Sequence, residues 1–264
     1  MMEIFGYFAS LFIGITLGLI GSGGTILTVP ILVYLFHQKP EQATGYSLFI
    51  VGITSAIGAI RHYSMGNLQL KTALYFVVPS SIMLLVTRYY FLPQIPSKLL
   101  TLASFELTKD LLLLFLFAVL MILASLAMIR PTQKKENDAP IKPIQLSILG
   151  FFVGCVSGIL GAGGGFLIIP SLLFFGKLSM KQALGTSLFI ITTATLLGFA
   201  GDVLHGNEYD FVLLFKVSAL AILGLLIGTQ LAKKISGEQL KPLFGWFVLG
   251  MGIFILIQSL FFSH

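Results

Sequence analysis

The chain has 264 residues, of which 56% are hydrophobic and only 10% are charged, and its mean hydropathy is +0.99. A water-soluble domain of this length has too few charges to cover so many apolar side chains, so the composition excludes that class. The formal net charge of +6 comes without a basic run interleaved with aromatic residues, which argues against binding to nucleic acid. The sequence therefore predicts an integral membrane protein.

Apolar segments follow one another along the whole chain. In order, they cover residues 4–20, 26–36, 43–60, 72–92, 111–129, 144–160, 166–176, 183–204, 211–232 and 240–262. Because lipid-exposed backbone must form its hydrogen bonds internally, we expect each segment to be helical and the fold to be all-α. We expect the first segment to be retained in the membrane, since it lacks the basic region and the cleavage site of a signal peptide.

The second half of the chain repeats the first. A shift of 140 residues aligns positions 14–67 with 154–207 without a gap, and 18 of the 54 aligned residues are identical. The clearest match joins GLIGSGGTILTVP at 18–30 to GILGAGGGFLIIP at 158–170. The predicted organisation is a first transmembrane repeat over 1–129, a cytoplasmic linker over 130–143 and a second repeat over 144–264.

Charge placement predicts how the two repeats are oriented. Lysine and arginine favour cytoplasmic loops, and they gather in the linker, at 177–181 and at 233–241. The turn at 202–210 carries acidic residues without lysine or arginine, which suits the outside. Residues 144–176 are then predicted to begin and end on the cytoplasmic side, as a hairpin that is broken at its glycines. Residues 4–36 are predicted to form a similar hairpin that begins and ends on the outside. Each repeat is predicted to hold one broken hairpin and three spans, with the two repeats inverted.

Inverted repeats with broken helices are typical of transporters that hold their substrate near the membrane midplane. A buried glycine turn frees backbone N–H groups at the start of the returning half-helix, where the helix dipole favours an anion. The candidate substrate-binding residues are the two turns and one serine in each repeat: Gly21, Ser22, Gly23, Gly24, Thr25, Gly161, Ala162, Gly163, Gly164, Gly165, Ser47 and Ser187. Helix packing alone is the alternative, and it applies most to the pairs Gly14–Gly18 and Gly154–Gly158.

Three polar residues near predicted membrane ends are candidates for proton coupling: His62, Asp202 and His205, the first two at equivalent positions of the repeats. Arg88 follows a long apolar run, and we expect it to reach the interface as an anchor rather than to contact an anion. The sequence has no metal-ligand spacing and no catalytic constellation, so we expect no cofactor, no metal and no enzymatic activity. The expected partners are a small anion and the bilayer. The oligomeric state is left open, with a homodimer as one option.

The segments GLIGSGGTILTVPIL and GILGAGGGFLIIPSLL, each followed by QATGYSLFI or QALGTSLFI, and the later GLLIGTQLAKKI resemble the TauE/SafE family of membrane transporters. The resemblance covers nearly the whole chain. It implies a bacterial inner-membrane permease for sulfite, a sulfonate or another sulfur-containing organic anion. The first repeat departs from the second where Leu84 and Arg88 match Gly224 and Gly228, so strict two-fold equivalence is not expected.

Together these features predict a secondary transporter that exports such an anion by alternating access, with the anion held at two opposed glycine turns. A passive anion channel is the second option, because it shares the same glycine-turn chemistry. A membrane-embedded enzyme is the third option, and it would need a reactive constellation that the sequence does not offer.

Overall fold

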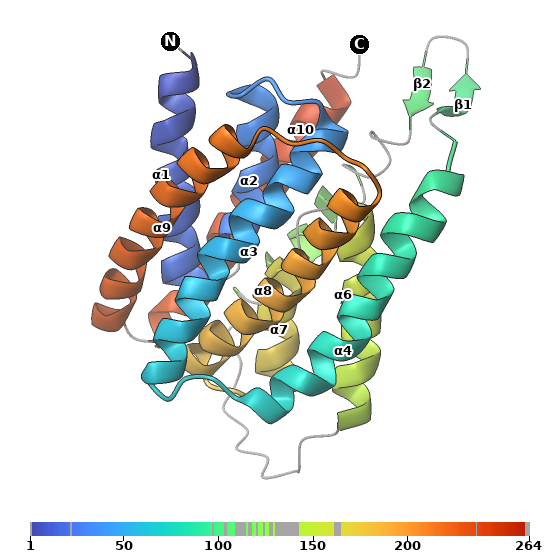
Figure 1. Ribbon diagram of the computed structural model, residues 1–264. Helices are drawn as coiled ribbons and strands as arrows, with labels where there is room; N and C mark the ends of the chain where they lie inside the picture. Colours follow the sequence, from blue (N-terminus) through green and yellow to red (C-terminus); the bar gives the residue numbers. More distant parts are fainter. Residues whose placement is uncertain are drawn as a thin grey trace.

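The computed structural model describes residues 2–21, 23–96, 98–102, 105–108, isolated positions between 115 and 129, 143–160, 165–235 and 237–261. Within these ranges the chain forms a bundle of helices (Figure 1). The strands that these ranges contain, β1 (Lys98–Leu102) and β2 (Phe105–Thr108), pair as a short antiparallel hairpin beside the bundle. The all-α prediction holds for the bundle, and the β-hairpin is a small addition to it. The predicted linker lies outside the described residues, apart from Pro143.

The first repeat contributes a helical hairpin and two long helices. The hairpin consists of α1 (Met2–Ile20) and α2 (Gly23–Tyr34), and α3 (Pro40–Ser64) and α4 (Leu70–Val86) follow it. A π-helical turn at Thr87–Phe91 and a 3₁₀ turn at Leu92–Gln94 extend α4. We call the end of the bundle where α3 begins and α8 ends the upper end, since it lies at the top of Figure 1. The opposite end, where α3 ends, is the lower end.

The second repeat contributes the equivalent elements. These are α6 (Pro143–Leu160), α7 (Gly165–Phe174), α8 (Met180–Leu204) and α9 (Phe211–Lys234), followed by α10 (Gly237–Phe261). Their bounds agree with the predicted apolar segments to within a few residues. In Figure 1, α1 starts at the upper end of the bundle, whereas its equivalent α6 starts at the lower end.

The helices of the two repeats pack on each other in a reciprocal pattern. α1 lies along α9, its equivalent α6 lies along α4, and α3 crosses α8 in the middle of the bundle. Glycines allow these close approaches: a Cβ atom at Gly14 would collide with the carbonyl oxygen of Ala221, and one at Gly154 with that of Ser80. Small residues of this kind let membrane helices approach closely. The packing role considered for Gly14 and Gly154 is therefore what the structure shows.

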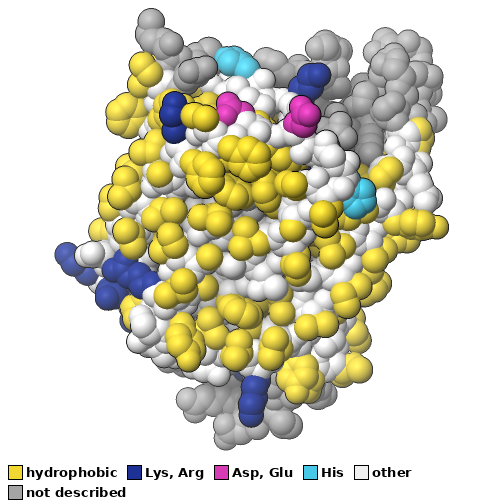
Figure 2. Space-filling view, in the orientation of Figure 1, with side chains coloured by type: hydrophobic (Ala, Val, Ile, Leu, Met, Phe, Trp, Pro, Cys, Tyr) yellow, Lys and Arg dark blue, Asp and Glu magenta, His cyan; other side chains and the backbone are white. Residues whose placement is uncertain are grey.

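The outer surface of the bundle is apolar. Phe8, Ile82 and Phe215 remain 67%, 57% and 62% exposed. Figure 2 shows hydrophobic side chains over most of the visible face, with charged side chains near its top, at its left edge and at its bottom. Four helical stretches of the described chain are long and apolar enough to cross a membrane: Gln42–Ser64, Leu70–Gln94, Met180–Leu204 and Phe211–Lys234. The architecture is that of a multi-pass membrane protein.

The glycine-lined contact between α1 and α9 predicts a difference between two glycine substitutions. Gly14→Ala should destabilise the purified protein by about 1–3 kcal/mol, because the added methyl group overpacks a backbone contact. Gly250→Ala is the matched control, since Gly250 is exposed on α10 and alanine favours helix by up to about 1 kcal/mol. Thermal unfolding of monodisperse protein in detergent measures both. Equal midpoints for the two variants would show that the close approach contributes nothing to stability.

Candidate functional site

The turn of the first hairpin is buried against the second repeat. Gly21 has φ of +75°, a conformation that glycine adopts without strain. A Cβ atom at this glycine would lie 3.0 Å from Oγ of Ser187 and 2.7 Å from a methyl carbon of Leu184, both on α8. The structure thus brings together two of the candidate substrate-binding residues, Gly21 and Ser187, from different halves of the chain.

The other residues of the glycine motifs divide into three groups. Gly24 has a packing role, because a Cβ atom there would collide with the carbonyl oxygen of Ile13 on α1. Gly23 begins α2, Thr25 is buried in the first turn of that helix, and Gly165 is buried as the first residue of α7. Helices α2 and α7 contact each other, so the two returning half-helices meet. Five predicted turn residues lie outside the described residues: Ser22, Gly161, Ala162, Gly163 and Gly164.

The two candidate serines occupy equivalent positions on α3 and α8. Both are buried, Ser47 with 1% and Ser187 with 0% of its surface exposed. The Ser187 hydroxyl donates to the carbonyl oxygen of Leu184 at 2.9 Å, whereas the Ser47 hydroxyl has no hydrogen-bond partner in the described part of the chain. A buried hydroxyl without a partner costs free energy. Ser47 is therefore available to donate to a ligand.

A polar cluster at the upper end centres on Asp202, near the C-terminus of α8, which is 1% exposed. Arg88 binds it in a bidentate manner, with Nε 2.7 Å from Oδ1 and Nη2 2.6 Å from Oδ2. The Tyr89 hydroxyl donates to Oδ1 at 2.9 Å and the Tyr209 hydroxyl to Oδ2 at 3.0 Å. Arg88 also donates to Oγ1 of Thr44 on α3 at 3.2 Å. We call these five residues the Asp202 cluster.

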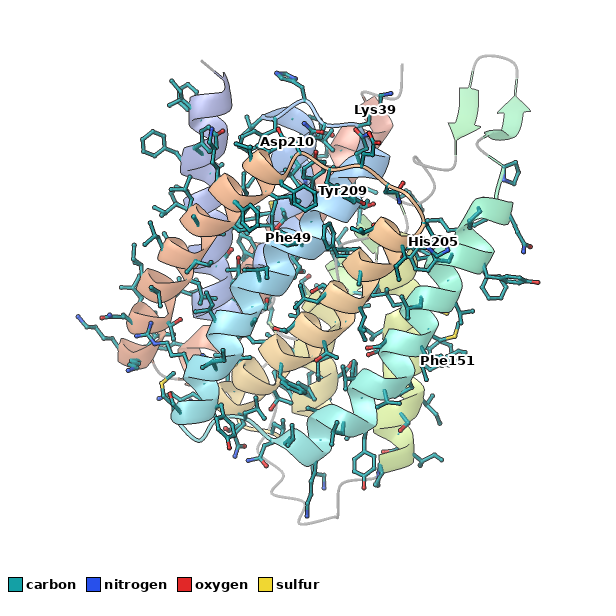
Figure 3. All side chains as sticks on the ribbon, viewed as in Figure 1. Lys39, Phe49, Phe151, His205, Tyr209 and Asp210 are labelled. Atoms are coloured by element: carbon teal, nitrogen blue, oxygen red, sulfur yellow. The ribbon has the colours of Figure 1, made fainter. Side chains whose placement is uncertain are left out.

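The Asp202 cluster ties three helices and one loop together. Arg88 and Tyr89 lie on the π-helical turn after α4, a type of turn that often marks functional sites. Tyr209 lies in the connection between α8 and α9, as Figure 3 shows. Burial and the neighbouring Asp202 carboxylate raise the pKa of Tyr209, so its phenol remains a hydrogen-bond donor. Because the charges are buried, paired and hydrogen-bonded, removing one partner should be strongly unfavourable.

The prediction that Arg88 is an interfacial anchor is wrong. Its side chain is 9% exposed and turns inward to the carboxylate of Asp202. Pairing replaces extension to the interface because an unpaired carboxylate in an apolar bundle would be costly. The partners Tyr89, Tyr209 and Thr44 were not expected. The sequence feature that could have indicated this ion pair is the presence of an arginine and an aspartate in apolar segments. The two residues lie 114 positions apart, however, and nothing in the sequence pairs them.

The remaining proton-coupling candidates differ in environment. His62, the repeat equivalent of Asp202, is 4% exposed near the C-terminus of α3, and neither ring nitrogen has a hydrogen-bond partner among the residues described. His205 is exposed at the end of α8, where its ring stacks on Tyr89 with centroids 4.2 Å apart. Its Nδ1 lies 2.8 Å from the carbonyl oxygen of Gly201. The structure does not test proton transfer, which stays a prediction.

Comparison with known proteins agrees with this architecture. The family model described as "Sulfite exporter TauE/SafE" matches residues 7–255. A probable membrane transporter protein of Xylella fastidiosa (strain 9a5c) is 27% identical over 94% of this chain and 92% of its own length. The probable membrane transporter protein YdhB of Bacillus subtilis is 31% identical over 87% of this chain and 90% of its own length. The similar protein MJ0441 of Methanocaldococcus jannaschii is 27% identical over 93% of this chain and 92% of its own length.

The family match spans nearly the whole chain, from α1 into α10, and the relatives align over most of their own length. It includes both glycine motifs and every helix of the Asp202 cluster. The chain therefore belongs to the TauE/SafE family of membrane transporters.

Proposed function

We propose that this protein is a secondary transporter of the bacterial inner membrane that exports a small anion, namely sulfite, a sulfonate or another sulfur-containing organic anion. Membership of a transporter family whose model is named for sulfite export supports the substrate class. The described residues contain no group of three or more metal-ligating side chains. Transport of an intact anion needs only a selective site and access to it from each side.

One observation carries the proposal: the buried Gly21 turn lies against Ser187 of the other repeat, next to the start of α2. The first turn of a helix presents N–H groups that lack partners within the helix, and the dipole there favours negative charge. The hydroxyl group of Ser47 on α3 adds a donor without a partner of its own in the described part of the chain, and Ser187 lies on α8, which crosses α3. We assign the anion to this region, held between the two returning half-helices.

The reciprocal packing of the helices supports inverted repeats. α1 begins at the upper end and α6 at the lower end, and α1–α9 packing is matched by α6–α4 packing. The ends of α3 and α9 and the start of α8 place Arg61, Lys181, Lys233 and Lys234 at the lower end. The positive-inside rule then puts the lower end in the cytoplasm.

Alternating access requires that one end of the site be closed while the other is open. The Asp202 cluster closes the upper end by binding α4, α8 and the loop before α9 to one another. The proposed transition breaks or rearranges this cluster when the outer side opens. His62 and Asp202 are our proposed groups for proton coupling, because both are titratable and buried at equivalent positions, and the exposed His205 is a third candidate.

Counterflow in proteoliposomes tests the transport activity. Vesicles loaded with unlabelled sulfite should transiently accumulate labelled sulfite above its external concentration, which a passive channel cannot do. Ser47→Ala should raise the half-saturating concentration by about tenfold, since one donor to a charged group contributes about 1.5 kcal/mol. Ser10→Ala is the matched control, because Ser10 is equally buried but donates within α1 to the carbonyl oxygen of Gly6.

Equilibration of the label without overshoot would assign the protein to the channel alternative. Unchanged half-saturation in Ser47→Ala, in protein that transports sulfite, would move the anion site away from this serine.

Cysteine accessibility tests the inverted arrangement. In a Cys155→Ala background, a cysteine replacing Lys39 should react with an impermeant thiol reagent from the outside, because Lys39 lies at the upper end (Figure 3). A cysteine replacing Lys177, in the connection between α7 and α8, should react from the cytoplasmic side. Reaction of both from the same side would mean that the hairpins enter in parallel, which contradicts inverted repeats.

A further inference from the structure

A pocket of about 160 Å³ opens at the lower end, away from the Asp202 cluster. It lies where α3 and α9 end and α8 begins, and its lining includes His62, Asn67, Lys181, Leu184, Thr229 and Lys233. Its volume exceeds the space that one water molecule occupies several-fold, and it suits a small polyatomic ion. In the proposed orientation this pocket faces the cytoplasm.

The chemistry of the lining favours an anion. Lys181 and Lys233 bring two positive charges to the pocket, and none of the lining residues that the structure describes is acidic. His62 is 96% buried at the pocket wall, and both of its ring nitrogens lack a hydrogen-bond partner in the described part of the protein. A buried polar group of this kind needs a partner, and an anion that accepts from an imidazole N–H supplies one.

The internal repeat shows how the lower end differs from the upper end among the residues that the structure describes. With the shift of 140 residues, His62 takes the position of Asp202, and Thr229 that of Tyr89. The equivalent of Arg88 is Gly228, which has no side chain. At the upper end, Arg88 and Tyr89 fill the space around a carboxylate that belongs to the protein. At the lower end the pocket stays open, and its described lining residues include two lysines and no carboxylate.

The pocket also adjoins the glycine turn. Leu184 lines the pocket and is the side chain nearest to the position of a Cβ atom at Gly21. Thr229 lines it too, and its backbone nitrogen lies 2.7 Å from the position of a Cβ atom at Gly18 on α1. A ligand in the pocket is therefore separated from the proposed substrate turn by the side chain of Leu184.

We propose that this lower pocket binds the small oxyanion on the cytoplasmic side before it passes Leu184 to the glycine turn. His62 donates to the anion, while Lys181 and Lys233 attract it. The inference rests on the proposed function for the identity of the anion, but the site itself is defined by charge and geometry and is tested without transport.

The test uses a cysteine at the pocket wall. In a Cys155→Ala background, Met65→Cys places a thiol at a residue that lines the pocket. This thiol is reacted with an anionic reagent, a methanethiosulfonate that bears a sulfonate, and with a cationic one that bears a trimethylammonium group. Each reaction rate is divided by the rate of the same reagent with a small free thiol. We expect the anionic reagent to be favoured by about tenfold at low ionic strength, as in a cleft of uniform charge. Sulfate should slow the labelling, and chloride at equal ionic strength should not.

Three comparisons make the result specific. Ser64→Cys, one residue earlier and exposed outside the pocket lining, shares the basic surface and should show no sulfate protection. Lys181→Gln and Lys233→Gln, both at exposed positions, should each reduce the preference for the anionic reagent. His62→Leu, which removes the N–H donor, should abolish sulfate protection while the charge preference remains.

Equal normalised rates of the two reagents at Met65→Cys would overturn the lower pocket as an anion site. So would a lack of sulfate protection at Met65→Cys, or sulfate protection of the same size at Ser64→Cys. That result is independent of counterflow by the unmodified protein. Sulfite transport without pocket protection refutes only the pocket, and pocket protection without transport refutes only the proposed function.

Discussion

A buried ion pair in an apolar bundle constrains the rest of this structure. The side chains of Asp202 and Arg88 are buried, at 2% and 9% exposed, so each charge depends on the other and on the hydroxyl groups of Tyr89 and Tyr209. The pair fixes the end of α8 against the π-helical turn that follows α4. Any movement that opens this end must break or transfer those hydrogen bonds together, which favours two discrete arrangements over continuous loosening.

The repeated helices give the bundle a near-symmetric frame, and a few side chains break that symmetry. Reciprocal glycine packing holds α1 on α9 and α6 on α4 in both halves. At the positions of Arg88 and Tyr89, however, the second repeat has Gly228 and Thr229. One end of the molecule is therefore filled and neutralised internally, whereas the other keeps a pocket with a basic lining. In the proposed orientation, the end that holds the ion pair faces the outside and the pocket faces the cytoplasm.

Much of this architecture follows from the sequence because membrane helices have few alternatives. Apolar length predicts the described helices to within a few residues, whereas most of the segment predicted at 111–129 lies outside the described residues. The gapless shift of 140 residues predicts which helices are equivalent. The packing of Gly14 follows from its spacing to Gly18. The β-hairpin at 98–108 was not expected, because the apolar pattern that predicts membrane helices gives no signal for it.

The polar clusters were harder to predict than the helices. Arg88 was expected at the interface because an isolated arginine after an apolar run usually extends there, and only the three-dimensional pairing with Asp202 reverses that expectation. Thr44, Tyr89 and Tyr209 carry no sequence pattern that connects them to a carboxylate. The proposed turn site is intermediate: the glycine pattern predicts its location, and the contact of Gly21 with Ser187 became visible only in the fold.

The central claim is that the Arg88–Asp202 pair holds the upper end closed. Spin labels on cysteines replacing Tyr90 and Leu204, which are 64% and 85% exposed beside that end, allow the distance between α4 and α8 to be measured by pulsed electron resonance. With Asp202 intact, we predict one narrow distance distribution. In Asp202→Asn, which keeps the side-chain volume and removes the charge, a second and longer distance should be populated in monodisperse protein. A distribution that is identical with and without the carboxylate would contradict the account, because the ion pair would then play no part in closing the outer side.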